Sequence, residues 1–193
     1  NDNKSFFEVA TYFNDYQNLL GTDTLAGSGA GTGNQFNGGS VHAYGAEVLA
    51  GRTFQYNNIS YPITLSYTYT DARFNSTFTE NGIEEWGDVS KGNRLPYIAT
   101  HQFTLNTGMK YQKLHINFLT RFSGSSYADV KATKKVPSYM IFDAFVRYQI
   151  KENLILFTAI DNITNKKYIA SYNPYGLRGG KPMAIKIGGT YKF

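Results

Sequence analysis

The sequence of 193 residues contains no cysteine, which excludes a disulfide scaffold, a thiolate metal site and a cysteine nucleophile. It also lacks any run of 18 apolar residues, so it offers no transmembrane helix. Charged residues make up only 17% of the chain, against roughly 25% in ordinary soluble domains. The formal net charge of +5 is modest, and it allows an anionic partner without requiring one.

Aromatic residues, by contrast, are abundant: 16 Tyr, 14 Phe and 1 Trp make up 16% of the chain. Apolar residues recur with a period of two, which predicts β-strands rather than helices. The alternation is clearest at the end of the chain, where Gly189 is the one gap in the apolar face. That face consists of Met183, Ile185, Ile187, Tyr191 and Phe193.

The same alternation predicts eight strands along the chain. They lie at residues 4–20, 40–54, 59–74, 99–111, 114–128, 138–150, 153–162 and 182–193. Most are 10 to 17 residues long, whereas strands of soluble proteins usually have about 5–6 residues and a tilted bilayer-spanning strand needs about 9–11. Segment 4–20 alternates less cleanly, and segment 153–162 is apolar in both phases, so its two faces stay unassigned.

The connections between these segments alternate between short and long. Residues 55–58, 112–113 and 151–152 are short connections, and residues 21–39, 75–98, 129–137 and 163–181 are long ones. This order predicts a meander with tight turns at one end and long loops at the other, as in outer-membrane barrels. The predicted fold is therefore all-β, an antiparallel transmembrane barrel meander. A soluble β-sandwich or barrel is the alternative, but strongly aromatic faces opposite neutral polar faces favour lipid.

Three segments resemble the C-terminal barrel of TonB-dependent outer-membrane transporters. Residues 40–48, SVHAYGAEV, resemble a strand in which a small residue and glycine precede a lumenal glutamate, here Glu47. Residues 93–101, NRLPYIATH, resemble the loop that re-enters the barrel, with Ala99 where the family often has proline. Residues 159–168, AIDNITNKKY, resemble the family's Asn-Leu-x-x-x-x-Tyr run. The alternating strand that ends on Phe193 is similar to the signal read by the outer-membrane assembly machinery.

The resemblance implies that residues 1–193 are the C-terminal part of a 22-stranded barrel in the bacterial outer membrane, whose plug domain lies outside this sequence. It implies TonB-dependent uptake of a metal complex, a ferric siderophore or ferric citrate. The implied partners are the rest of the barrel, the plug, TonB and membrane lipids including lipopolysaccharide. The alternative is a complete eight-stranded porin or structural barrel without TonB coupling.

No catalytic constellation, metal site or cofactor site is evident, so we expect no enzyme; His42, His101 and His115 fall on different predicted strands. Basic and tyrosine residues in the long loops are better candidates, because arginine pairs bidentately with carboxylates. If these loops share one rim of the barrel, a ferric carboxylate or siderophore complex would suit it. Lipopolysaccharide phosphates or plain solvation are the alternatives, and nucleic acid is not expected. The candidate substrate-binding residues are Arg94, Tyr172, Tyr175, Arg178 and Lys181.

Overall fold

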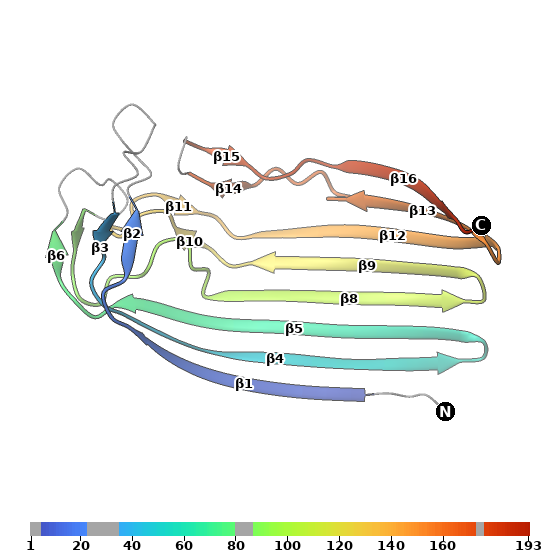
Figure 1. Ribbon diagram of the computed structural model, residues 1–193, viewed down its shortest axis with the longest axis horizontal. Helices are drawn as coiled ribbons and strands as arrows, with labels where there is room; N and C mark the ends of the chain where they lie inside the picture. Colours follow the sequence, from blue (N-terminus) through green and yellow to red (C-terminus); the bar gives the residue numbers. More distant parts are fainter. Residues whose placement is uncertain (1–4, 23–34, 80–86, 173–175) are drawn as a thin grey trace.

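The computed structural model describes residues 5–22, 35–79, 87–172 and 176–193, and its main feature is one curved sheet of eight strands (Figure 1). Neighbours in the sheet follow each other in the sequence, and every pair is antiparallel. The strands are β1 (Ser5–Tyr16), β4 (Val41–Tyr56), β5 (Ile59–Phe74), β8 (His101–Tyr111), β9 (Leu114–Ser123), β12 (Tyr139–Lys151), β13 (Leu154–Asp161) and β16 (Ala184–Tyr191). The predicted meander is confirmed. No helix among the described residues is long and apolar enough to cross a membrane.

The two ends of the sheet differ as the connection lengths predict. Tight turns join β4 to β5, β8 to β9 and β12 to β13, all at one end (Figure 1). Asn57 and Gln112 adopt positive φ in two of these turns, at 51° and 49°, as two-residue hairpin turns require. The start of β1 and the end of β16 lie at this same end, and the long connections lie at the other (Figure 1).

Each long connection contains a short hairpin that the alternation does not predict. The four pairs are β2 (Leu20–Thr22) with β3 (Gln35–Asn37), β6 (Phe78–Thr79) with β7 (Asp88–Val89), β10 (Ser126–Tyr127) with β11 (Lys135–Val136), and β14 (Ile169–Ser171) with β15 (Arg178–Gly179). Two or three residues per strand are too few to show a period. Some predicted strands also end early, at Tyr16 in place of residue 20 and at Ser123 in place of residue 128.

The strand register gathers the apolar side chains on one face of the sheet. Val48 is opposite both Val9 and Tyr67, and the row continues through Phe103 and Phe122. Directly opposed residues share a face, and the pairings of β12, β13 and β16 keep the same phase, so this face extends across all eight strands. Its side chains are exposed, with Ile187 at 83% and Phe7 at 71% exposure. An apolar face of this extent is unsuited to water and suits lipid contact.

Glycines explain the two segments whose alternation is unclear. In β13, Leu156, Thr158 and Ile160 belong to the apolar face, while Phe157 points to the opposite, polar face. There the Phe157 ring covers Gly188, where an added Cβ would lie 2.5 Å from it. In β1, Phe6 covers Gly51 and Tyr12 covers Gly45 in the same way. Aromatic residues on the polar face therefore occupy space that glycines on the neighbouring strand leave open.

We expect Gly45→Ala to destabilise the barrel by about 1–3 kcal/mol, because overpacking forces the neighbours to move. The added Cβ would lie 2.1 Å from the carbonyl oxygen of Tyr69, which is backbone, and 2.5 Å from the Tyr12 hydroxyl. Gly179→Ala is the matched control, since its Cβ would meet nothing within 4 Å, and it should change stability by under about 0.5 kcal/mol. The measurement is thermal unfolding of the full-length protein in detergent. Equal midpoints for both variants would contradict the close packing of Tyr12 over Gly45.

Candidate functional site

The long connections pack against each other at their end of the sheet. Val41, Phe74, Val89 and Val130 form a buried apolar cluster. Val41 and Phe74 are opposite each other on the polar side of β4 and β5, while Val89 and Val130 come from two different connections. Further apolar side chains, Leu19, Phe78 and Leu95, pack around this cluster. The connections therefore share one core, and that core lies over the polar side of the sheet.

Hydrogen bonds join the same connections. The Tyr172 amide donates to the Tyr97 hydroxyl at 3.3 Å, and the Tyr172 hydroxyl donates to the Lys135 carbonyl at 3.2 Å. The Tyr97 amide donates to the Tyr127 carbonyl at 2.7 Å. Three connections meet at this point, so the candidate residue Tyr172 holds loops together with both of its polar groups. Lys131 adds an ion pair to Asp88, at 3.1 Å, between two of them.

Asp129 organises the connection between β10 and β11. Its carboxylate accepts hydrogen bonds from the Thr133 hydroxyl at 2.6 Å, the Thr133 amide at 3.1 Å and the Lys134 amide at 2.8 Å. Burial by itself raises the pKa of Asp129, but the hydrogen bonds from Thr133 and Lys134 outweigh it and lower the pKa below its ordinary value. The carboxylate is therefore a structural acceptor that stays ionised near neutral pH.

Asn162 fixes the two ends of the last long connection. Its side chain donates to the carbonyls of Lys166 and Lys181, at 3.0 and 2.9 Å, and accepts from the Lys166 amide at 2.8 Å. Asn162 is 2% exposed and has a φ of 50°, a conformation that asparagine tolerates better than most residues. The backbone amide of Asn162 donates to the Asp143 carboxylate at 2.8 Å. These contacts account for the asparagine in the 159–168 motif.

The cations of this connection differ in how they are paired. The Lys181 and Lys186 ammonium groups both contact one carboxylate oxygen of Asp161, at 2.5 and 2.9 Å. The hydrogen bond to Asp161 raises the pKa of Lys181. Two cations on one carboxylate leave a net positive charge. Arg178 is exposed in β15, opposite Ser171, and has no ion-pair partner among the described residues.

The five candidate residues are only partly brought together. Tyr172, Arg178 and Lys181 belong to the connection between β13 and β16. Arg94 belongs to the connection between β5 and β8, where it is opposite Arg73 in an isolated bridge and donates to the Thr100 hydroxyl at 3.0 Å. Arg73 follows the apolar-face phase of β5, so Arg94 is on the apolar side. Tyr175 lies outside the described residues.

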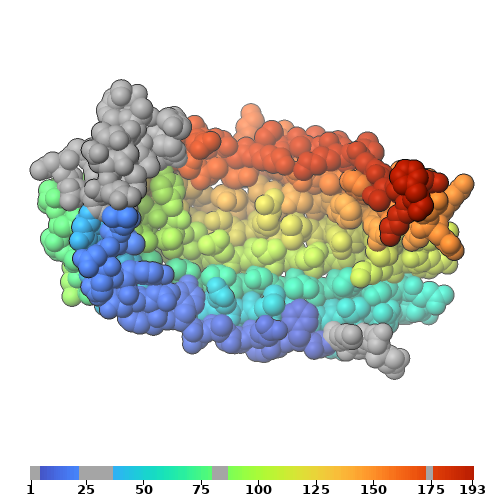
Figure 2. Space-filling view, in the orientation of Figure 1, coloured from blue at the N-terminus to red at the C-terminus, as the bar shows by residue number. Residues whose placement is uncertain are grey.

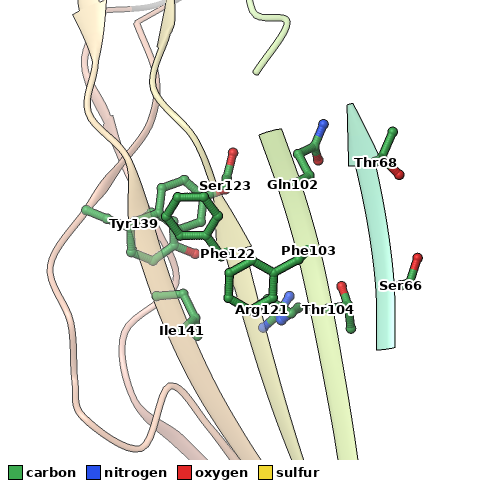
Figure 3. A pocket seen from close by; sticks show the side chains of 11 residues that line it. Ser66, Thr68, Gln102, Phe103, Thr104, Arg121, Phe122, Ser123, Tyr139 and Ile141 are labelled. Atoms are coloured by element: carbon green, nitrogen blue, oxygen red, sulfur yellow. The ribbon is translucent and has the colours of Figure 1, made fainter. Parts of the chain in front are cut away.

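A hollow of about 260 Å³, which no pattern in the sequence indicates, opens on the polar face (Figure 3). It is lined mostly by hydroxyl and amide groups from neighbouring strands. The one guanidinium, that of Arg121, donates to Asp143 at 2.7 Å and is thereby neutralised. The hollow thus offers hydrogen bonds without net charge. The polar lining residues include Ser66, Thr68, Gln102, Thr104, Arg121 and Ser123.

Comparison with known proteins assigns the family. Residues 1–163 match the TonB-dependent receptor-like β-barrel family, and the chain belongs to it. It is 29% identical over 188 residues to the ferrichrome outer membrane transporter/phage receptor of Escherichia coli K12, covering 91% of this chain and 23% of that protein. It is 32% identical over 109 residues to the probable TonB-dependent siderophore receptor PiuA of Acinetobacter baumannii, covering 55% and 15%. The chain therefore spans less than a quarter of each of these relatives.

Solved structures agree on the fold. The siderophore receptor PiuA from Acinetobacter baumannii superposes with a TM-score of 0.74 at 22% identity, over 98% of this chain and 26% of that one. The unliganded ferric citrate transporter FecA gives 0.75 at 23% identity, over 100% and 29%. The prediction of an antiparallel barrel wall in the bacterial outer membrane is confirmed. In such a barrel the apolar face meets lipid, the polar face lines the lumen, the tight turns are periplasmic and the long loops extracellular.

We expect the stability of the loop around Asp129 to fall as the pH is lowered, and not as it is raised. Because its folded-state pKa lies below the ordinary 3.8, the stabilisation is complete above about pH 5 and is lost as the pH falls through the folded-state value. The measurement is amide exchange of Thr133 and Lys134 in the full-length protein, corrected for intrinsic rates, from pH 7 to pH 3. Asp129→Ala should remove the protection already at pH 7, with the β9 amides as control. Protection that survives in the variant would contradict this role.

Proposed function

We propose that this chain is the C-terminal wall of a TonB-dependent receptor that takes up a metal complex, with ferric siderophores or ferric citrate as the substrate class. The family match over residues 1–163 carries the proposal. The relatives support the substrate class, since those named above are a ferrichrome transporter, a probable siderophore receptor and a ferric citrate transporter. Bond-breaking chemistry is not part of the proposal, because a barrel wall binds and guides its substrate.

The edges of the sheet support a larger barrel. Strands β1 and β16 are each paired on one side only, and they form opposite edges of the wall (Figure 2). An unpaired strand edge is too costly to persist in lipid, so both edges need further strands. A complete eight-stranded barrel would pair β1 with β16, and the described residues contain no such pairing. We therefore favour a barrel of 22 strands in which residues 1–193 form the C-terminal part.

The lumenal face supports the presence of a plug. Glu8 and Glu47 line a hollow of about 380 Å³ on β1 and β4. Neither carboxylate has a cationic partner among the described residues. A domain inside the barrel would supply cations to them, and a segment of it would contact TonB to receive energy from the inner membrane.

Arg94 fits a different partner from the other candidates. It lies on the apolar side of the sheet, at the extracellular end, beyond the lipid-facing side chains of β5. A guanidinium in this position is suited to lipopolysaccharide phosphate rather than to a substrate inside the barrel. We assign Arg94 to the lipid contact, and Arg178 with Lys181 to the metal complex.

We expect Arg178→Ala in the full-length receptor to weaken binding of an anionic ferric citrate complex about tenfold, which corresponds to about 1.4 kcal/mol. A neutral ferric hydroxamate should lose less, because the positive charge of Arg178 has no ion-pair partner among the described residues. Lys113→Ala, in a periplasmic turn, is the control and should leave both affinities unchanged. Affinities are measured by fluorescence quenching. If the receptor binds neither chelate, the proposed function is overturned. If Arg178→Ala binds ferric citrate as tightly as the unaltered receptor, the assignment of Arg178 is overturned.

A further inference from the structure

Three basic side chains lie side by side on the lumenal face, near the periplasmic turns. Lys110 of β8 is directly opposite His115 of β9, and His115 is directly opposite Arg147 of β12. Directly opposed residues share a face, with Cβ atoms about 4.5–5.5 Å apart. Arg147 has the same strand phase as Asp143, which pairs with Arg121 beside the lumenal hollow. We call these three residues the cation row.

No carboxylate of the described chain neutralises the cation row. Its neighbours across the sheet are Ser60 at one end and Phe157 at the other. None of the three side chains forms an ion pair with a described residue. Asp143 shares the face and the strand of Arg147, but it is four residues away, about 13 Å along the strand, and is already bound to Arg121.

Such an arrangement favours an anionic neighbour. The imidazole of His115 is mostly uncharged at neutral pH, so the row holds two cations, Lys110 and Arg147, on either side of it. A cation without a carboxylate partner is costlier in a lumen sheltered from bulk water than on an open surface, and both cations stay in the wall for as long as the barrel is folded. The compensating anion is therefore a resident group rather than a substrate that passes through. The row is also close in sequence to the tight turns that join β8 to β9 and β12 to β13, at the end of the sheet opposite to the long loops (Figure 1).

We propose that the cation row docks carboxylate side chains of the domain that fills the lumen. This inference rests on the proposed function, because it needs a receptor with a plug. The wall then has an acidic side, with Glu8 and Glu47 on β1 and β4, and a basic side on β8, β9 and β12. A domain with complementary charges is held in one rotational position by this division.

Zero-length carbodiimide coupling of the full-length receptor in detergent tests the contact, because it joins an amine to a carboxylate only where the two touch. Peptide mapping by mass spectrometry should find Lys110 coupled to an Asp or Glu of the domain preceding this chain. Lys186 with Asp161, 2.9 Å apart, is the internal positive control, and Lys113 in the adjacent turn is the negative control. The inference is overturned if Lys186 couples to Asp161 while Lys110 couples to nothing, or only to Glu152.

The Arg147→Met variant should behave differently when a carboxylate is docked on the cation row and when none is. If a carboxylate is docked, Arg147→Met should raise amide exchange about tenfold in the plug peptide that couples to Lys110, while Lys113→Met leaves it unchanged. If nothing is docked, Arg147→Met removes an unpaired cation from the lumen, so it raises the thermal midpoint of the barrel and leaves plug exchange as it was. Chelate binding by the same samples separates the two proposals: a receptor that binds the ferric complex but shows no coupling loses only this inference.

Discussion

The rest of the structure depends on a strand register that is kept across eight antiparallel strands. Because side chains alternate with a period of two, a slip of one residue would move a whole apolar set into the lumen. Among the described pairings of this sheet the one register shift lies between Gln149 and Lys151, next to a turn, where it costs least. The lipid-facing side, the lumenal hollow and the cation row are all consequences of the same register.

Glycine makes that register compatible with aromatic residues on both faces. Lipid selects aromatic and aliphatic side chains on one side, yet Phe6, Tyr12 and Phe157 point to the other. The far end of each ring packs over a glycine of the neighbouring strand, so it fills space that a side chain there would occupy. The lumenal face thereby stays mainly polar, although one-sixth of the chain is aromatic.

Most of the sheet could be predicted from the sequence, because alternation is a local signal. The faces of residues 153–162 could not, since they depend on Gly188, which lies 31 positions after Phe157. The loop hairpins are too short to show a period. Tyr172 was predicted to bind substrate, and that assignment remains a prediction. What the sequence could not reveal is that both of its polar groups already hold other loops, because one acceptor, Lys135, lies 37 residues earlier.

The distribution of charge on the lumenal wall bears on how the plug of the proposed receptor would be held there. Glu8 and Glu47 lie on one side and the cation row on the other, while Arg121 and Asp143 neutralise each other on β9 and β12, nearer the long loops. Three of the rings on this face, those of Phe6, Tyr12 and Phe157, already cover glycines. A domain seated against such a wall is held by hydrogen bonds and ion pairs rather than by a shared apolar core. Polar interfaces of this kind separate more readily than hydrophobic ones. In the proposed receptor, a plug held in this way would stay in register at rest and would still yield if a partner pulled on it.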